Sequence, residues 1–167
     1  MNKIAHFEKV SEEQFYGGLK KIRDGFSDGY YKNVYDNIIL PQRATTGSAG
    51  HDIASPIAFE LKPNQEIVIP LGIRCVIDEG YVMLVFPRSS MGIKHGLYIK
   101  NTVPVIDSDY SRSDNEGHIY LCVVNGGDKS VCIYEGDRIA QAMFVPFGVA
   151  DTEKVTVKRN GGIGSTD

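Results

Sequence analysis

The sequence RCVIDEGYVMLVFP, residues 74–87, holds two short apolar runs on either side of the tripeptide Asp78-Glu79-Gly80. Val, Ile, Tyr and Phe favour half-buried strands, and a polar tripeptide ending in Gly favours a tight reversal of the chain. We therefore expect a β-hairpin with strands at residues 74–78 and 81–87.

Similar runs recur along most of the 167-residue chain, and its 18 glycines and 7 prolines are spread widely between them. Many short strands with turn residues between them are typical of an all-β sandwich or barrel. Further strands are expected at residues 4–10, 37–40, 57–61, 66–70, 97–100, 118–124, 131–134 and 138–146.

The N-terminal residues follow a different pattern. Ser11-Glu12-Glu13-Gln14 has the form of a helix capping box, and apolar residues follow it at helical spacing. We expect a helix over residues 11–23, which Gly17-Gly18 weakens by up to ~2 kcal/mol. Residues 24–37, with tyrosines and a phenylalanine among polar residues, are expected to form an ordered loop.

The composition, with 42% hydrophobic and 23% charged residues, is that of a globular protein and excludes wholesale disorder. We expect three parts: an N-terminal addition (residues 1–37), a β domain (residues 38–157) and a mobile Gly-rich tail (residues 158–167). A short helical turn is expected at residues 89–94.

Charge and cysteine usage narrow the function classes. Lys+Arg total 18 against 21 Asp+Glu, and a net charge of -3 argues against direct nucleic-acid binding, which needs a basic field. Three cysteines without a CxxC pair favour reduced thiols over a disulfide framework or a zinc ribbon. No apolar run reaches the ~18 residues of a membrane span, and the first 15 residues are unlike a signal peptide. We expect a cytoplasmic protein with no membrane partner.

Three segments carry groups suited to phosphate. In residues 87–92, PRSSMG, the guanidinium fork of the Arg and two neighbouring hydroxyls could bind an anion. The alternative interpretation is an ordinary helix start capped by a Ser. Strand alternation along residues 138–146 predicts that Gln141 shares a face with Ile139 and Met143. Gln141 is then either a hydrogen-bond donor to a ligand or a polar group satisfied within the protein. Residues 159–166, RNGGIGST, resemble a phosphate-cradling loop or else a disordered tail.

The stretch from residue 107 to 128 is acidic, and its later carboxylates, Glu116 among them, are expected to be solvated. Asp107 differs because it follows the apolar pair Val105-Ile106. Burial at the end of a strand would make it a usable base. The four histidines lack metal-ligand spacing and are expected to be structural or exposed.

Five ordered segments together resemble the motifs of the trimeric dUTPase family: AGHDI (49–53), PRSSMG (87–92), VIDSDY (105–110), GDRIAQ (136–141) and GGIGST (161–166). The resemblance runs from about residue 38 to 167. It implies a jelly-roll-like β-barrel and a homotrimer whose three active sites each draw residues from all three subunits. It also implies hydrolysis of dUTP to dUMP and pyrophosphate with Mg²⁺, which limits uracil in DNA and supplies dUMP for dTMP synthesis.

The resemblance implies a role for each matching residue. Asp107 matches the catalytic carboxylate that orients and deprotonates the attacking water. Tyr110 matches the ring that packs on deoxyribose, and Asn101 the amide that reads uracil. Asp52 would help to hold Mg²⁺ through water. The implied phosphate ligands and closing tail residues are Arg88, Ser89, Ser90, Gln141, Arg159, Ile163, Gly164 and Ser165.

The chain departs from the family pattern at several points. Pro104 replaces a Gly, residues 111–117 form an insert, and Ile163 replaces the Phe that stacks on uracil. Stacking contributes roughly 1–3 kcal/mol per base, so weaker closure of the tail is expected. Lys158 or Arg159 could be the tail's phosphate ligand, and the planar fork of Arg159 favours it.

Two other hypotheses remain. A related dCTP deaminase shares the Arg-Ser-Ser segment but resembles a site with a glutamate base, and here the only nearby glutamate is Glu116 in the insert. Alternatively, the trimer binds a regulatory protein through the N-terminal addition and the insert, in addition to its catalysis.

Overall fold

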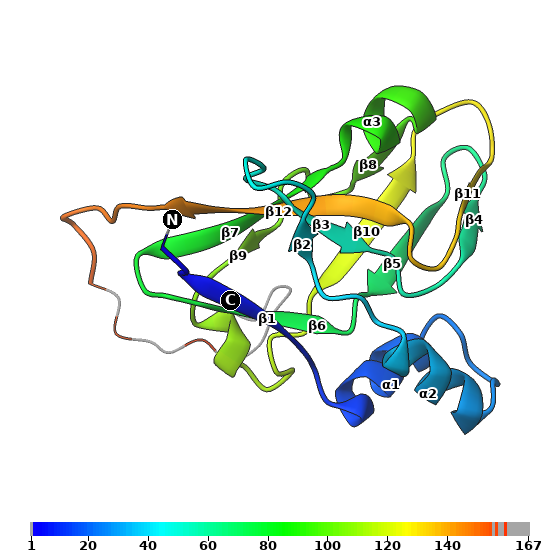
Figure 1. Cartoon of the computed structure of the whole chain (residues 1–167), viewed down its shortest axis with the longest axis horizontal. Helices are drawn as coiled ribbons and strands as arrows, with labels where there is room; N and C mark the ends of the chain where they lie inside the picture. Colours follow the sequence, from blue (N-terminus) through cyan, green and yellow to red (C-terminus); the bar gives the residue numbers. More distant parts are fainter. Residues whose placement is uncertain (1, 155, 157–158, 160–167) are drawn as a thin grey trace.

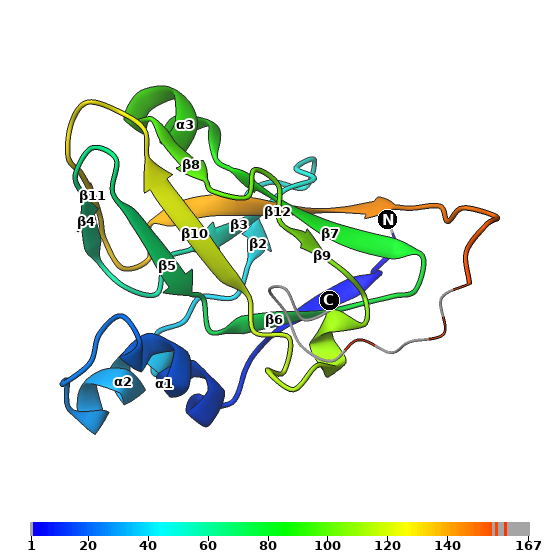
Figure 2. The same cartoon turned by 180° about the vertical axis from the view of Figure 1, so that it is seen from behind.

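The computed structural model describes residues 2–154, 156 and 159. It is mainly β, which confirms the predicted all-β class (Figures 1 and 2). The elements in chain order are β1 (Ala5–Lys9), α1 (Glu12–Lys20), α2 (Asp28–Asp36), β2 (Gln42–Arg43), β3 (His51–Ala54), β4 (Phe59–Leu61), β5 (Glu66–Pro70), β6 (Ile73–Ile77), β7 (Tyr81–Pro87), α3 (Ser89–His95), β8 (Leu97–Ile99), β9 (Val105–Ile106), the 3₁₀ turn η1 (Tyr110–Arg112), β10 (Tyr120–Asn125), β11 (Val131–Ile133) and β12 (Arg138–Pro146).

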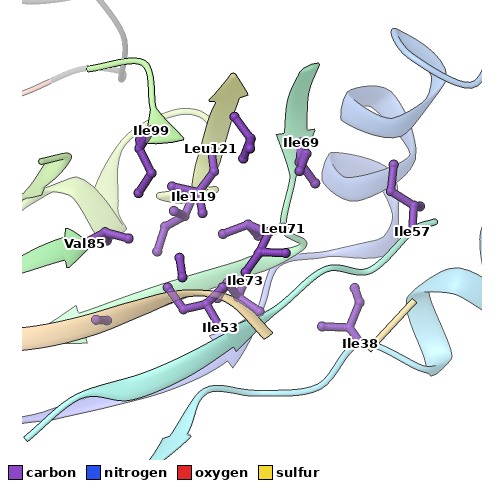
Figure 3. Close-up of a cluster of buried hydrophobic side chains, with 14 of the residues drawn as sticks. Ile38, Ile53, Ile57, Ile69, Leu71, Ile73, Val85, Ile99, Ile119 and Leu121 are labelled. Atoms are coloured by element: carbon purple, nitrogen blue, oxygen red, sulfur yellow. The ribbon is translucent and has the colours of Figure 1, made fainter. Parts of the chain in front are cut away.

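The described strands pair antiparallel in four sheets. The largest has the order β2-β3-β12-β7-β9, a second has β5-β10-β8, and two pairs, β1-β6 and β11-β4, complete the set. Inward side chains of these sheets form one core, part of which Figure 3 shows around Leu71, Ile73 and Ile119. Each fully buried aliphatic side chain of this kind contributes about 1.5–3 kcal/mol, so this core is the main source of stability.

Strands β7 and β12 have the predicted bounds, but the side-chain alternation predicted for β12 is wrong at its start. The register with β3 shifts between Arg138 and Ala140, which marks a β-bulge at Ile139. Ile139 and Ala140 are therefore both buried in the core. Gln141 consequently does not share a core face with Ile139, and its half-buried side chain lines a surface cavity.

The predicted hairpin is also wrong, although its turn is present. Tyr81 N–H donates to Asp78 O at 3.3 Å, and Gly80 has φ 84°. β6, however, pairs with the N-terminal strand β1, whereas β7 pairs with β12 and β9. The turn thus carries the chain from one sheet to another.

The N-terminal residues contain two helices where one was expected. α1 confirms Ser11 as its cap, because Ser11 Oγ accepts from Gln14 N–H at 3.2 Å, but the reciprocal bond of a capping box goes to Glu116 and not to Gln14. α2 contradicts the predicted loop: Ser27 caps it, and Tyr31 and Val34 are buried one turn apart. Gly18 also has a packing reason, because a Cβ there would lie 2.7 Å from the Tyr120 hydroxyl.

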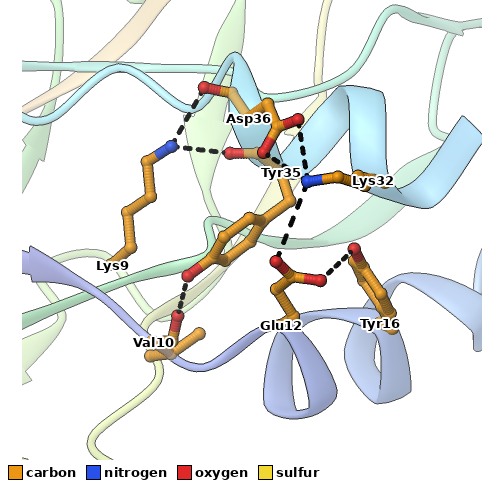
Figure 4. A network of polar contacts seen from close by, with 7 residues as sticks. All are labelled: Lys9, Val10, Glu12, Tyr16, Lys32, Tyr35 and Asp36. Atoms are coloured by element: carbon orange, nitrogen blue, oxygen red, sulfur yellow. Dashed lines mark hydrogen bonds and ion pairs between the residues drawn. The ribbon is translucent and has the colours of Figure 1, made fainter. Parts of the chain in front are cut away.

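The two helices lie beside each other at one end of the molecule, and a polar network joins them to β1 (Figures 1 and 4). Tyr35 Oη donates to Val10 O at 2.7 Å, and Lys9 Nζ donates to Tyr35 O at 2.8 Å. Lys32 pairs with Asp36 at 3.1 Å. The N-terminal segment is therefore held as a unit against the sheets.

Residues 37–40 do not form the predicted strand. Asn37 is the C-cap of α2, and Ile38 packs in the core at the start of the segment that leads to β2. The strands β2 and β3 were not predicted, whereas β9 confirms the strand expected at Val105-Ile106 before Asp107. The expected helical turn after Arg88 is confirmed as α3. Within the described residues, no helix combines the length and apolar character needed to cross a membrane.

Candidate active site

One cavity of about 430 Å³ opens between β9, β10 and the loop that follows β8. Three predicted site residues line it: Asn101, Asp107 and Tyr110. Pro104, which replaces the family's Gly, is buried beside it and accepts from Val85 N–H at 3.1 Å. Since that bond continues the β9–β7 ladder, this Pro is accommodated through its carbonyl. Sequence reasoning missed three further polar lining residues, Lys100, Tyr120 and Cys122.

Asp107 follows β9, which is an edge strand of only two residues paired with β7. Its side chain is 44% exposed. The expectation that Asp107 is buried is therefore wrong for the single chain, because a short edge strand leaves its end open to the cavity. The carboxylate nevertheless faces the same cavity as Asn101 and Tyr110.

Arg159 also lies in this cavity. Its guanidinium donates to Asp107 Oδ2 and, at 2.9 Å, to Asp109 Oδ1. The same group lies 6.0 Å from the ring centroid of Tyr110. In this chain Arg159 thus pairs with the predicted catalytic carboxylate and not with the other predicted phosphate ligands. Four other predicted tail residues lie outside the described part of the chain: Lys158, Ile163, Gly164 and Ser165. The predicted mobility of the tail concerns the same undescribed segment.

Tyr110 is held firmly at the back of the cavity. It is 8% exposed, and its hydroxyl donates to His118 O at 2.7 Å while accepting from Asn115 Nδ2 at 2.8 Å. Burial raises the pKa of Tyr110 above its ordinary value, so the phenol stays protonated and can donate at neutral pH. The ring's position therefore depends on residues of the insert.

A second cavity, of about 550 Å³, collects the predicted phosphate ligands. Arg88, Ser89, Ser90 and Gln141 line it, from the start of α3 and from β12. Arg88 is the N-cap residue of α3, and the two serines begin the helix. An arginine fork beside two hydroxyls and an amide suits a phosphate chain, whose oxygens accept hydrogen bonds from all of them.

Asp52 lies in the second cavity as well and is paired with two arginines. Its Oδ1 is 3.0 Å from Arg88 Nε and its Oδ2 is 3.0 Å from Arg138 NH1. Among the described residues, no group of three His, Cys, Asp or Glu side chains could hold a metal ion by itself. Each Asp52 oxygen keeps a free lone pair that can accept from a metal-bound water, so Asp52 fits an ion held mainly by phosphates.

The two cavities lie apart on the single chain. Figure 2 shows α3, at the second cavity, at the opposite end of the β framework from the short helical turn after β9 that carries Tyr110. None of the lining residues is common to both cavities. One chain thus presents a nucleoside-sized cavity with a carboxylate and, separately, an anion cavity.

These features define an all-β protein with two cavities, one lined by an amide, a ring and a carboxylate and the other by an arginine, two serines and a glutamine. The model of the dUTPase family matches residues 36–166, and the chain belongs to this family.

Relatives in bacteria agree with this assignment. The deoxyuridine 5'-triphosphate nucleotidohydrolase of Lactococcus lactis is 41% identical over 139 residues, which cover 81% of this chain and 91% of that protein. The enzyme of the same name from Dictyoglomus turgidum is 40% identical over 144 residues, covering 81% and 95%.

Solved structures show the same fold. The dUTPase from Streptococcus mutans has a TM-score of 0.66 and 31% identity and covers 87% of this chain and 98% of that chain. A dUTPase from phage phi11 of S. aureus, described with a species-specific insert, has a TM-score of 0.66 at 21% identity and covers 93% and 97%. At that identity the phage protein supports the fold alone.

Proposed function

We propose that this chain is a dUTP diphosphatase, which hydrolyses dUTP to dUMP and pyrophosphate. The observation that carries the proposal is the shared cavity of Asn101, Tyr110 and Asp107, which offers an amide, a ring and a carboxylate in a volume suited to a nucleoside. Family membership and the names of the bacterial relatives support the same activity.

Asp107 is the proposed catalytic residue. Its carboxylate accepts a hydrogen bond from a water and takes its proton as the water oxygen bonds to the α-phosphorus. The bond from that phosphorus to the bridging oxygen breaks in line, and pyrophosphate leaves with the electron pair. A positioned general base of this kind contributes about 10²–10⁴-fold to the rate. Its partial exposure is compatible with the role, because the water must reach it.

Asn101 and Tyr110 provide selectivity in this proposal. The Asn101 amide has both a donor and an acceptor, as the imide edge of uracil requires. The Tyr110 ring, fixed from behind by two hydrogen bonds, leaves no room for a 2′-hydroxyl. UTP is rejected because its sugar would have to displace a firmly held ring.

The second cavity binds the phosphates through Arg88, Ser89, Ser90 and Gln141. Asp52 orients Arg88, and its carboxylate would help to hold a Mg²⁺ ion through water. When bound, that ion neutralises charge on the departing pyrophosphate. The structure of one phage phi11 dUTPase is described as revealing the coordination of a structural Mg(II) ion.

We propose that the enzyme acts as a homotrimer. A single chain keeps its nucleoside cavity and its phosphate cavity apart, so a complete site requires the second cavity of another copy. The tail, with Arg159, Ile163, Gly164 and Ser165, closes over the nucleotide, and Arg159 exchanges Asp107 for a phosphate. Light scattering tests the assembly, and a particle of one or two chains would contradict it.

The chain divides, in this proposal, into an N-terminal addition (residues 1–37), a β domain (residues 38–157) and a tail (residues 158–167). It acts in the cytoplasm, in line with three cysteines that form no disulfide.

A regulatory protein partner would bind the N-terminal addition and the insert. A pull-down with both segments intact and with each deleted tests this, and an unchanged partner set would refute it.

The decisive experiment measures pyrophosphate release from dUTP, UTP, dCTP and dTTP with Mg²⁺. We expect release from dUTP only. Asp107→Asn should lower turnover by about 10²–10⁴-fold while dUTP binding persists, because the amide keeps the shape but cannot take a proton. Full turnover by this variant would refute the mechanism. Ammonia release from dCTP would instead indicate a deaminase, which Glu116 disfavours because its carboxylate is engaged by Ser11.

A further inference from the structure

The loop of residues 113–118, which belongs mainly to the insert, forms the support behind Tyr110. Asn115 Nδ2 donates to the Tyr110 hydroxyl at 2.8 Å, and that hydroxyl donates to His118 O at 2.7 Å. Ser113 Oγ donates to Tyr110 O at 2.6 Å. Both the phenol and the backbone of Tyr110 are thus tied to this one loop.

The loop has a backbone conformation that needs external support. Glu116 has φ 58° and Gly117 has φ 70°, so two successive residues are left-handed. A non-Gly residue in this region is disfavoured and persists where surrounding contacts hold it. Ala at position 117 is excluded, because its Cβ would lie 2.6 Å from Ser111 Cα. Contacts of the Glu116 side chain therefore add to the loop's own hydrogen bonds in holding this shape.

Glu116 is anchored by the N-terminal segment. Its carboxylate accepts from Ser11 N–H at 2.8 Å and from Ser11 Oγ–H at 2.6 Å. These bonds hold the pKa of the Glu116 carboxyl below its ordinary value. Glu116 thus takes the place that Gln14 would have in a capping box, and the expectation that Glu116 is merely solvated is wrong.

The segment that carries Ser11 is itself fixed. The network of Figure 4 ties Lys9 and Val10, just before Ser11, to Tyr35 at the end of α2. α1 also touches the nucleoside cavity from behind, because Gly18 packs against the hydroxyl of Tyr120, which lines that cavity. Ser11 therefore offers a stationary anchor 105 residues away from Glu116 in the sequence.

We propose that Asn115 and Glu116 are positioning residues for Tyr110, and that Ser11 of the N-terminal segment anchors them, so that selectivity for deoxyribose depends on residues outside the catalytic cavity. This inference rests on the proposed dUTP hydrolysis. Without the Ser11–Glu116 bonds the 113–118 loop relaxes and the Tyr110 ring gains room to move. A ring that can move admits a 2′-hydroxyl and packs less well on deoxyribose.

The test compares two helix-cap variants of the full-length chain. Ser11→Ala removes the cap of α1 together with one bond to Glu116. Ser27→Ala removes the equivalent cap of α2. The Ser27 hydroxyl accepts from Tyr30 N–H at 3.3 Å and has no bond to the 113–118 loop. Both lose one cap, so general destabilisation is matched between them. The readout is the ratio of kcat/KM for dUTP to that for UTP.

We expect Ser11→Ala to lower this ratio about 3- to 10-fold, the range for loss of one hydrogen bond, and Ser27→Ala to keep it. Glu116→Gly, which loses the carboxylate but suits the left-handed backbone, should lower the ratio similarly. Glu116→Gln should rescue much of it, because its amide oxygen can still accept from Ser11.

Equal ratios for Ser11→Ala, Ser27→Ala and the unmodified chain would overturn the inference, as would an unchanged ratio in Glu116→Gly. Both outcomes leave the proposed function intact, since the unmodified chain hydrolyses dUTP in each. Failure of the unmodified chain to hydrolyse dUTP would overturn the proposed function and the inference together.

Discussion

The carboxylate of Asp52 accepts from Arg88, with Oδ1 3.0 Å from Nε, inside the cavity that collects the phosphate ligands. Asp52 is only 14% exposed, and its other oxygen is engaged by Arg138. A charged fork held from one side presents its remaining N–H groups in a fixed direction. Asp52 therefore fixes the direction in which Arg88 would meet a phosphate in the proposed function.

Asp52→Asn should raise the KM for dUTP about 10-fold with a smaller change in kcat. The amide keeps the shape of the side chain but replaces one acceptor by a donor, so one arginine loses its partner. Hydrogen bonds to charged groups contribute about 1.5–3 kcal/mol, and partial exposure favours the lower end. Steady-state kinetics at several Mg²⁺ concentrations measures the effect.

The matched control is Glu8→Gln, which weakens the Glu8–Arg74 pair of 2.6 Å on β1 and β6, outside both cavities. It should leave the KM unchanged. If excess Mg²⁺ restores the KM of Asp52→Asn, the carboxylate acts on the metal and not on Arg88.

Gly50→Ala should weaken dUTP binding through Gln141. A Cβ at residue 50 would lie 2.8 Å from Gln141 Oε1, the end of a flexible side chain, so Gln141 would shift while the backbone stays. Loss of one ligand hydrogen bond predicts a Kd about 3- to 10-fold higher, with little change in the midpoint of thermal unfolding. Binding of a non-hydrolysable dUTP analogue by calorimetry provides the measurement.

Gly47→Ala serves as the control in the same loop, because nothing lies within 4 Å of a Cβ built there. It should change neither affinity nor thermal stability. An equal loss of affinity in both variants would point to the loop backbone in place of Gln141.

Local sequence pattern predicted the strands whose apolar runs end at clear turn residues. β7 and β12 have the predicted bounds because Gly80 and Gly136 precede them and Pro87 and Pro146 end them. α2 was missed because its apolar positions are mostly tyrosines among polar residues, a composition that is typical of a loop. Only the structure shows that Tyr31 packs in the core. The pairing of β6 with β1 instead of β7 is tertiary and leaves no local trace.

The site residues divide in the same way. The described residues implied by the family resemblance line the two cavities, but Arg159 lies with Asp107 and apart from the other implied phosphate ligands. The motifs could not predict partners distant in the sequence, such as Arg138 for Asp52 or Ser11 for Glu116. The exposure of Asp107 was mispredicted because it depends on β9 being a short edge strand.

The stability of the fold should fall in mildly acidic solution because of His118. This ring is fully buried, and its Nε2 accepts from Gly72 N–H at 2.9 Å, so it must stay neutral at that atom. Burial lowers the pKa of His118 from 6.5 to about 4. The unfolded chain therefore binds a proton between these pH values that the folded chain does not.

The free energy of unfolding should consequently decrease as pH falls from about 6.5 towards 4, by about 3 kcal/mol for a pKa difference of this size. Chemical denaturation at half-unit pH steps measures the decrease. The lowered pKa of Glu116 reduces stability in addition only below about its ordinary value of 4.5, so the upper part of this pH range reports on histidine. His51, whose pKa burial also lowers, contributes in the same direction.

His118→Gln separates the two histidines. Its amide oxygen can accept from Gly72 N–H but does not titrate, so this variant should be less stable than the parent at pH 7 yet show a shallower loss between pH 6.5 and 4.5. His51 remains in both proteins and cancels in the difference. Parallel pH profiles for parent and variant would mean that His118 is protonated equally in the folded and unfolded chains. A shallower profile in the variant would show that the buried ring of His118, whose backbone oxygen accepts from the Tyr110 hydroxyl, limits the stability of the fold in acid.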